Sequence, residues 1–218
     1  MNKSSLVLAS GSPRRKELLT QLGYEFSVLV TDIEEQQQPD EDAQAYVQRL
    51  SLDKAKAALN LIAEQEPNSD NTVSLGSDNT ASLGSDNTAS LGSDNIVVLG
   101  SDTVVVSQGQ VLEKPSDLAD CKRMLTQLSD QRHQVMTAVS VVSADKHKTE
   151  IVITDVWFKP LSEQEIEKYW QTGEPCDKAG SYGIQGLGGR FVTRIEGSYY
   201  AVVGLPLFET DQLLQEFL

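Results

Sequence analysis

Residues 96–115 have the sequence IVVLGSDTVVVSQGQVLEKP, in which two apolar runs flank a short polar turn. The runs before and after Gln108-Gly109 are rich in Val and Leu, and β-branched residues bounded by turn residues are typical of strands. A glycine in a two-residue connection is typical of a β-hairpin. We therefore predict a hairpin in which Ser107 pairs with Gln110.

The root of this hairpin carries an acid and a base. Counting back from the turn places Thr103 opposite Lys114, so Asp102 and Lys114 come together at one end of the ribbon. Strict alternation would direct these two side chains to opposite faces, so their contact depends on a twist, a bulge or a strand end. Asp102 is either a functional carboxylate or a turn residue that caps the strand, and the spacing favours neither alternative.

The Gly-Ser-Asp motif of Asp102 also occurs three times upstream, with carboxylates at Asp78, Asp86 and Asp94. An octapeptide of the type LGSDNTAS repeats over residues 75–98, a shorter period than most solenoid arrays have. Segments rich in Ser, Asn, Asp and Gly lack the apolar surface to fold alone. We expect a tandem insertion that forms a mobile loop rather than a functional array. Asp102 differs from the other copies because the complete hairpin follows it.

Strand and helix patterns alternate on both sides of the hairpin. Pro13 at the first position and Gly23 beyond the end delimit the first predicted helix. The other predicted helices are 43–64, 117–128, 162–173 and 207–218; the predicted strands are 4–11, 24–33, 96–106, 110–114, 134–144, 149–158, 191–197 and 199–203, and 179–190 is a Gly-rich loop. This mixture implies an α/β protein with a central, partly antiparallel sheet, and no domain boundary is visible within residues 1–218.

Composition narrows the class of protein. With 218 residues and 39% hydrophobic content, the chain can form one large domain or two small lobes with a sizeable core. A net charge of −14 disfavours nucleic acid and anionic membranes as partners, although a local basic cluster could still bind a small polyanion. No apolar run reaches the roughly 20 residues of a membrane helix, and no secretory signal is visible, so we expect a cytoplasmic protein. Cys121 and Cys176 are expected to be reduced thiols.

The segment SGSPRRK, residues 10–16, joins a predicted strand to a predicted helix. Unpaired amides at the helix start, together with Ser10, Ser12, Arg14 and Arg15, suit a phosphate group. The alternative is that Ser12 only caps the helix and that the arginines are solvated.

Other polar residues have weaker patterns. Glu34 and Glu35 follow a predicted strand and could hold a hard cation such as magnesium with Asp102, although adjacent glutamates are more often solvated. Lys54 lies in the long helix, where a lysine usually faces solvent. His133 and His147 lack the spacing of a zinc site.

Taken in order, the segments resemble one family, the Maf-type nucleoside triphosphate pyrophosphatases. The matching segments are LASGSPRRKELL at 8–19, IEE at 33–35, DKA at 53–55, LGSDTVV at 99–105, LEKP at 112–115, DKAGSYGIQG at 177–186 and VVGLPL at 202–207. The resemblance covers nearly the whole chain. It implies a two-lobed Maf/ITPase-like α/β fold with a central twisted mixed sheet, flanking helices and an active-site cleft.

The resemblance also implies an activity and a set of site residues. Family members hydrolyse nucleoside triphosphates to the monophosphate and pyrophosphate with a divalent metal, here Mg²⁺ or Mn²⁺. Asp102 is implied as the proton acceptor, and Glu35 with Asp102 as the metal site. The implied phosphate-binding residues are Ser10, Ser12, Arg14, Lys54 and Lys114.

A branch of the family that acts on dTTP and UTP is similar at SPRR, SDT and YGIQG, which implies Arg15, Thr103 and Gln185 as the specificity residues. A nucleoside triphosphate, normal or modified at the pyrimidine, is therefore the implied small-molecule partner. A homodimer is one option that the sequence does not decide. Two alternatives remain: a non-catalytic nucleotide-binding regulator of septum formation and cell division, and a calcium-binding module based on the octapeptides alone.

Overall fold

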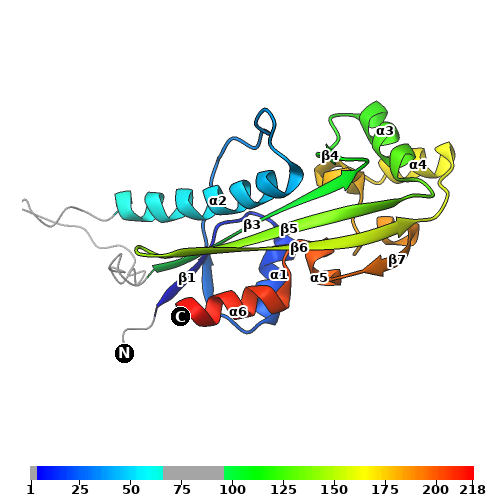
Figure 1. Cartoon of the computed structure of the whole chain (residues 1–218). Coiled ribbons are helices and arrows are strands. Elements are labelled where there is room, and N and C mark those ends of the chain that lie inside the picture. The colour runs from blue at the N-terminus through cyan, green and yellow to red at the C-terminus, as the bar shows by residue number, and fades with distance from the viewer. Residues whose placement is uncertain (1–3, 66–95) are drawn as a thin grey trace, which may run out of the picture.

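The computed structural model describes residues 4–65 and 96–218 (Figure 1). Asp78, Asp86, Asp94 and most of the octapeptide repeat lie outside these residues. Residues 96–98, the end of the predicted insertion 75–98, belong to a strand, and the proposal of a mobile insertion stays a prediction for residues 75–95.

One mixed sheet organises the part of the chain that the structure describes. The strand order is β2-β1-β3-β5-β6-β7, and β4 pairs with β3. β1 is parallel to β2 and β3, and the other pairs are antiparallel. The strands are β1 (Ser5–Leu8), β2 (Phe26–Val28), β3 (Ile96–Ser107), β4 (Gln110–Leu112), β5 (Arg132–Val142), β6 (His147–Phe158) and β7 (Val192–Glu196). The predicted α/β class with a central mixed sheet is confirmed.

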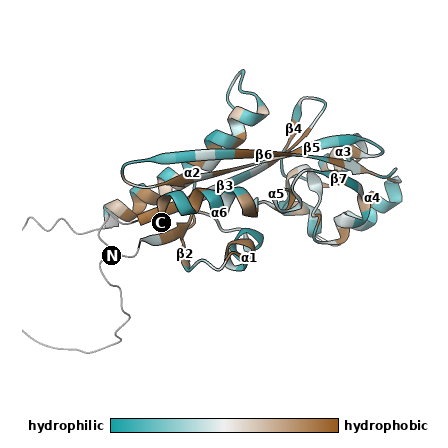
Figure 2. Ribbon diagram, turned by 60° about the horizontal axis from the view of Figure 1, so that its bottom comes forward, coloured by the Kyte–Doolittle hydropathy of each residue, from teal (hydrophilic) through white to brown (hydrophobic). Residues whose placement is uncertain are grey.

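Helices cover both faces of this sheet (Figure 1). α2 (Ala43–Gln65) packs on one face, and α1 (Pro13–Gln21), α5 (Tyr199–Val203) and α6 (Leu207–Phe217) pack on the other. α3 (Leu118–Leu128) and α4 (Glu163–Trp170) form a separate apolar cluster at the β4 end of the sheet. Apolar residues concentrate along the central strands (Figure 2). α2 thus extends along β3 from Ile96 to Val106, whereas α3 and α4 pack only at the β4 end.

The edge of β3 is open in its middle. On this edge β1 pairs with residues 96–99 and β4 pairs with residues 105–107. The opposite edge is paired with β5 from Val98 to Val106. β1 ends at Leu8, where the chain turns into α1, so residues 100–104 have no strand beside them on this edge among the described residues. Asp102 and Thr103 lie in this gap.

Gly100 lets α2 approach β3 closely. A Cβ atom at this position would overlap the Ser51 carbonyl oxygen and lie 2.9 Å from the Ala55 amide nitrogen, both on α2. Protein interiors are close-packed, so only glycine fits between this strand and this helix. The glycine of the Gly-Ser-Asp motif therefore brings Lys54, which precedes Ala55, next to Asp102.

The predicted hairpin is confirmed at the turn and wrong at its root. Ser107 pairs with Gln110, but the pairing of β4 ends at Leu112, so Thr103 does not face Lys114. Beyond Leu112 the Glu113 carbonyl accepts a hydrogen bond from the Gly180 amide instead. Thr103 is paired on its other side with Thr137 of β5.

The predicted strand at 199–203 is also wrong, because this segment is α5. The Ser198 side chain accepts a hydrogen bond from the Ala201 amide and caps the helix, and Gly204, with φ 125°, ends it. The predicted strand at 24–33 is shortened to Phe26–Val28 because its partner β1 ends at Leu8.

The two cysteines are free thiols, as expected. Within residues 4–65 and 96–218, no helix is long and apolar enough to cross a membrane.

Candidate active site

A cavity of about 750 Å³ opens at the gap in the β3 edge. It is bounded by the β1–α1 loop, α2, β3, the segment after β4 and the Gly-rich loop. Glu34, the neighbour of Glu35, is not among the lining residues. All ten side chains that the family resemblance implies line the cavity: Ser10, Ser12, Arg14, Arg15, Glu35, Lys54, Asp102, Thr103, Lys114 and Gln185. Their assembly in one place is a finding, whereas their individual roles remain predictions.

Lys54 connects the two predicted acidic residues. Its Nζ lies 2.6 Å from Asp102 Oδ1 and 2.7 Å from Glu35 Oε1. Lys54 and Asp102 are nearly buried, with 9% and 7% of their surface exposed, so the default expectation of a solvent-facing lysine fails at Lys54. Lys114 is mostly exposed and lies 3.6 Å from Glu35 Oε2. The carboxylate of Asp102 thus pairs with α2 rather than with the hairpin lysine.

The neighbouring cations control the ionisation of Glu35. Burial alone would raise the pKa of Glu35, but the hydrogen bond and charge of Lys54, with a contribution from Lys114, outweigh burial and hold the pKa below its ordinary value. Glu113, on the same side of the cavity, has a pKa raised mainly by burial, with Asp102 and Glu35 adding repulsion. The site therefore keeps Glu35 as a carboxylate at neutral pH.

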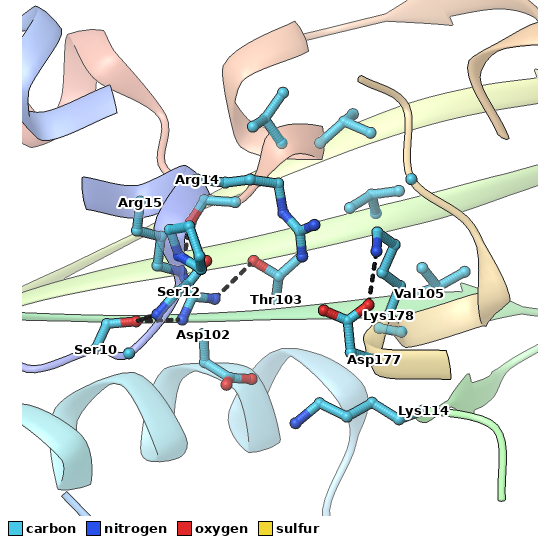
Figure 3. Close-up of a pocket in the computed structure, with 18 of the residues that line it drawn as sticks. Ser10, Ser12, Arg14, Arg15, Asp102, Thr103, Val105, Lys114, Asp177 and Lys178 are labelled. Carbon is cyan, nitrogen blue, oxygen red and sulfur yellow. Dashed lines mark hydrogen bonds and ion pairs between the residues drawn. The ribbon is translucent and has the colours of Figure 1, made fainter. Parts of the chain in front are cut away.

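Arg15 lies at the centre of a second set of contacts, on the opposite face of β3 (Figure 3). Its Nε donates to the Gly204 carbonyl at 2.9 Å, Nη1 to Ser10 Oγ at 3.3 Å and Nη2 to Thr103 Oγ1 at 3.2 Å. Burial lowers the pKa of Arg15, and the negative charges of Asp102 and Glu35 oppose that change. Three acceptor oxygens thus hold the guanidinium in the cavity wall.

The β1–α1 loop presents a hydroxyl donor. Ser10 Oγ accepts from Arg15 Nη1 and from the Ser12 amide at 3.2 Å. Because a hydroxyl oxygen accepts two hydrogen bonds, the remaining capacity of Ser10 is its proton. Ser12 is the N-cap residue of α1, but its side chain makes no capping hydrogen bond, and Pro13 begins the helix. This loop is therefore suited to an anion, as the sequence predicts.

The cavity also contains cations and acids that the sequence did not single out. Lys178 Nζ lies 2.6 Å from Asp177 Oδ1 and 2.7 Å from the Glu174 carbonyl oxygen, and its side chain is mostly buried. Arg14 points across the cavity toward this pair (Figure 3). The sequence did offer a signal for these residues, because Asp177 and Lys178 begin the segment DKAGSYGIQG that matches the family. Only Gln185 of that segment was assigned a role.

Glu174 holds the loop that contains Gln185. Its two carboxylate oxygens accept from the Leu187 amide at 2.8 Å, the Gly188 amide at 3.0 Å and the Tyr169 hydroxyl at 2.8 Å. Burial alone would raise the pKa of Glu174, but these hydrogen bonds lower it overall. The carboxylate of Glu174 thus anchors the Gly-rich loop through its backbone amides.

Tyr182 forms part of the cavity wall and rests on a buried histidine. Its hydroxyl lies 2.9 Å from His133 Nε2, and both rings pack edge-on against Phe158. Burial lowers the pKa of His133 to about 4, despite the opposing charge of Asp155. His133 is therefore neutral at physiological pH and has a structural role beneath the site.

The carboxylates of Glu35 and Asp102 are suited to a hard divalent cation whose remaining ligands come from a bound substrate. Glu35 and Asp102 converge on one point, the ammonium group of Lys54. Among the described residues, no three His, Cys, Asp or Glu side chains are arranged to hold a metal ion by themselves. Mg²⁺ commonly takes one or two carboxylates and completes its shell with substrate phosphates and water.

The fold and the cavity together define an α/β protein that can bind a polyanion beside a buried carboxylate. Comparison with known proteins assigns it to a family: the chain belongs to the Maf family, and the match to "Maf-like protein" extends over residues 5–217. It is 64% identical over 219 aligned positions to the dTTP/UTP pyrophosphatase of Vibrio parahaemolyticus, with all of both chains covered. It is 61% identical to the dTTP/UTP pyrophosphatase of Vibrio vulnificus, over 98% of each chain, and 57% identical to that of Vibrio cholerae, over all of both chains.

Proposed function

We propose that this protein is a hydrolase that cleaves dTTP and UTP to the nucleoside monophosphate and pyrophosphate. The observation that carries the proposal is the position of Asp102, which lies at the gap in the β3 edge among five cationic side chains. Membership of the Maf family and similarity to the full-length dTTP/UTP pyrophosphatases of the two Vibrio species support the same activity. Pyrimidine nucleotides with modified bases are a natural extension of this substrate class.

The chemical problem is the attack of water on a phosphorus shielded by negative oxygens. Arg14, Arg15, Lys54 and Lys114 line the cavity and would neutralise charge on the triphosphate and on the departing pyrophosphate. The hydroxyl proton of Ser10 adds a hydrogen bond to a phosphate oxygen.

Asp102 is proposed as the group that accepts the proton of the attacking water. Lys54 donates to Oδ1, which leaves Oδ2 to take that proton. The oxygens of a bound triphosphate compete with Asp102 for hydrogen bonds from the Lys54 ammonium group. When Lys54 is shared with the substrate it stabilises the Asp102 carboxylate less, so the basicity of Asp102 increases. Substrate binding and activation of the base are thereby coupled through one lysine.

A divalent cation, Mg²⁺ or Mn²⁺, is proposed as the cofactor, with Glu35 and Asp102 as its protein ligands. Such a cation neutralises charge on the phosphate oxygens when it is bound. The residue Glu35 is suited to this role because the neighbouring lysines hold it as a carboxylate.

The activity is tested by incubating the purified full-length protein with dTTP or UTP and Mg²⁺ in water enriched in oxygen-18. We expect pyrophosphate release and label in the monophosphate, because the attack is at the α-phosphorus. Label found only in pyrophosphate would contradict the position of attack. Tight nucleotide binding without pyrophosphate release would favour the alternative of a non-catalytic regulator.

A further inference from the structure

A chain of hydroxyl groups runs from the cavity wall into the protein. Thr103 Oγ1 lies 3.0 Å from Thr137 Oγ1, and Thr137 Oγ1 lies 2.7 Å from the carbonyl oxygen of Ala201 in α5. Thr137 and Ala201 are completely buried, whereas Thr103 is only partly buried and lines the cavity. The chain therefore links a cavity residue to a group that water does not reach.

The direction of each hydrogen bond in this chain follows from its buried end. A carbonyl oxygen can only accept, so Thr137 uses its single hydroxyl proton for Ala201. Thr137 must then accept from Thr103, which uses the proton of Thr103. Arg15 Nη2 donates to Thr103 Oγ1 at 3.2 Å and occupies one of its two lone pairs. What Thr103 can still offer to the cavity is one acceptor lone pair.

We propose that Thr137 is a positioning residue that fixes Thr103 as a hydrogen-bond acceptor, so that the cavity selects pyrimidine rings with an N3–H donor. Uracil and thymine carry this donor, whereas cytosine presents an acceptor at N3. The inference rests on the proposed function and adds to it the physical cause of discrimination against cytosine nucleotides. Thr137 acts through Thr103 and does not itself touch the substrate.

The two hydroxyl groups beside Arg15 have opposite hydrogen-bonding roles, one as a donor and one as an acceptor. Ser10 has both lone pairs occupied and offers a proton, which suits a phosphate oxygen. Thr103 has its proton occupied and offers a lone pair, which suits an N–H group. One guanidinium thus separates a donor position from an acceptor position within the cavity.

The test compares kcat/KM for UTP and CTP in the wild-type protein and in Thr137→Val, which keeps the shape of the side chain but removes the hydroxyl. In this variant the Thr103 hydroxyl proton can turn toward the cavity and donate a hydrogen bond to N3 of cytosine. Because a single hydrogen bond changes an equilibrium by up to about tenfold, we expect the UTP:CTP ratio to fall by about tenfold. Thr137→Ser restores the hydroxyl and should retain the wild-type ratio.

Two further variants make the test decisive. Thr137→Ala removes the same hydroxyl with a smaller side chain, and it replaces Thr137→Val if that protein does not fold. Ser140→Ala is a matched control, since Ser140 is a buried hydroxyl on the same strand that contacts Ser51 and Thr149 instead of the cavity wall. We expect the Ser140 variant to keep the wild-type UTP:CTP ratio.

An unchanged ratio in a folded Thr137→Val or Thr137→Ala protein would overturn the inference, as would an equal loss in Thr137→Ser. Binding of UMP and CMP by calorimetry provides a second readout that does not need turnover. A wild-type protein that hydrolyses no nucleoside triphosphate would refute the proposed function. The ratio of UMP to CMP affinity would still test the role of Thr137 in that case.

Discussion

Asp102 and Thr103 are adjacent in sequence, yet their side chains lie on opposite faces of β3. Asp102 contacts Lys54 of α2, and Thr103 contacts Arg15 of α1. Both can line one cavity because no described strand lies beside residues 100–104 on that edge. A single dipeptide therefore supplies a carboxylate to one side of the site and a hydroxyl to the other.

The position of Lys54 between two acids leads to a prediction about stability. Lys54→Met leaves Asp102 and Glu35 facing each other without their shared cation. Removing one partner of a buried ion pair costs about 3 kcal/mol or more, so we expect a loss of that size in the free energy of unfolding at neutral pH. Urea denaturation measures it, and adding Asp102→Asn should recover part of the loss. A Lys54→Met protein as stable as the wild type would contradict this account.

The buried His133 predicts a dependence of stability on pH. Its pKa is about 4 in the folded protein and 6.5 when unperturbed, so below pH 6.5 the unfolded chain binds the proton first. Stability from this residue is thus complete above about pH 7 and is lost as the pH falls toward 4. His133→Gln removes this contribution, because glutamine does not titrate.

The measurement is the difference in unfolding free energy between wild type and His133→Gln at several pH values. Between about pH 7.5 and pH 5 we expect this difference to change by about 2 kcal/mol in favour of the variant. Parallel curves for the two proteins would show that His133 is not buried as a neutral ring.

Ten residues selected from the sequence lie around one cavity in the structure, but the sequence did not give their contacts, and their roles stay predictions. The ten could be selected from the sequence because motifs far apart in the chain match the family in order, and all ten line the cavity. The contact of Asp102 with Lys54 could not be predicted, since it joins residues 48 positions apart and depends on the approach of α2 over Gly100. Glu174 and Lys178 were missed because their role is visible only where the loop folds back on them.

At the scale of secondary-structure elements, the length of a segment and the regularity of its apolar pattern determined whether its predicted structure was correct. α2 and β3 were predicted nearly to the residue because each has a long, regular apolar pattern. α5 was predicted as a strand because four of its five residues are aromatic or β-branched, and so short a segment fits either structure. The Ser198 cap and Gly204 delimit the helix. The Gly204 carbonyl then accepts from Arg15, and the Ala201 carbonyl accepts from Thr137.

The Gly-rich loop behind Gln185 gives an element-scale prediction. Leu187 and Gly188 donate to different oxygens of Glu174, so the NH₂ group of Glu174→Gln would face one of these two amides, and the loop loses part of its anchor. We expect faster amide hydrogen exchange over residues 183–190 and a KM for dTTP raised by about tenfold, consistent with a loss of about 1.4 kcal/mol. Mass spectrometry of exchange and steady-state kinetics measure the two effects.

Glu163→Gln is the matched control for that experiment. Glu163 is an exposed residue paired with Lys122 on α3, and exposed ion pairs contribute little. Equal exchange in the loops of the wild type and Glu174→Gln would show that Glu174 does not hold Gln185 in place.

At the scale of the whole molecule, a strongly anionic protein gathers cationic side chains at one cavity, which six carboxylates also line: Glu17, Glu35, Asp102, Glu113, Glu174 and Asp177. The net charge of −14 contrasts with the five lysines and arginines that gather at one opening. Fields within a cleft are focused by its walls, whereas distant surface charges are screened over about 8 Å at physiological salt. We therefore expect these lysines and arginines to contact a triphosphate at short range, and the anionic surface elsewhere to disfavour nucleic acid.

The most direct test of the account is the rate of pyrophosphate release from dTTP by Asp102→Asn, with Asp94→Asn as the control in an otherwise identical Gly-Ser-Asp motif. Loss of a catalytic base lowers the rate by about a thousandfold, so we expect that fall in kcat for Asp102→Asn with dTTP binding retained. Asp94→Asn should turn over like the wild type. Wild-type turnover in Asp102→Asn, or its loss in Asp94→Asn, would contradict the assignment of Asp102 as the base.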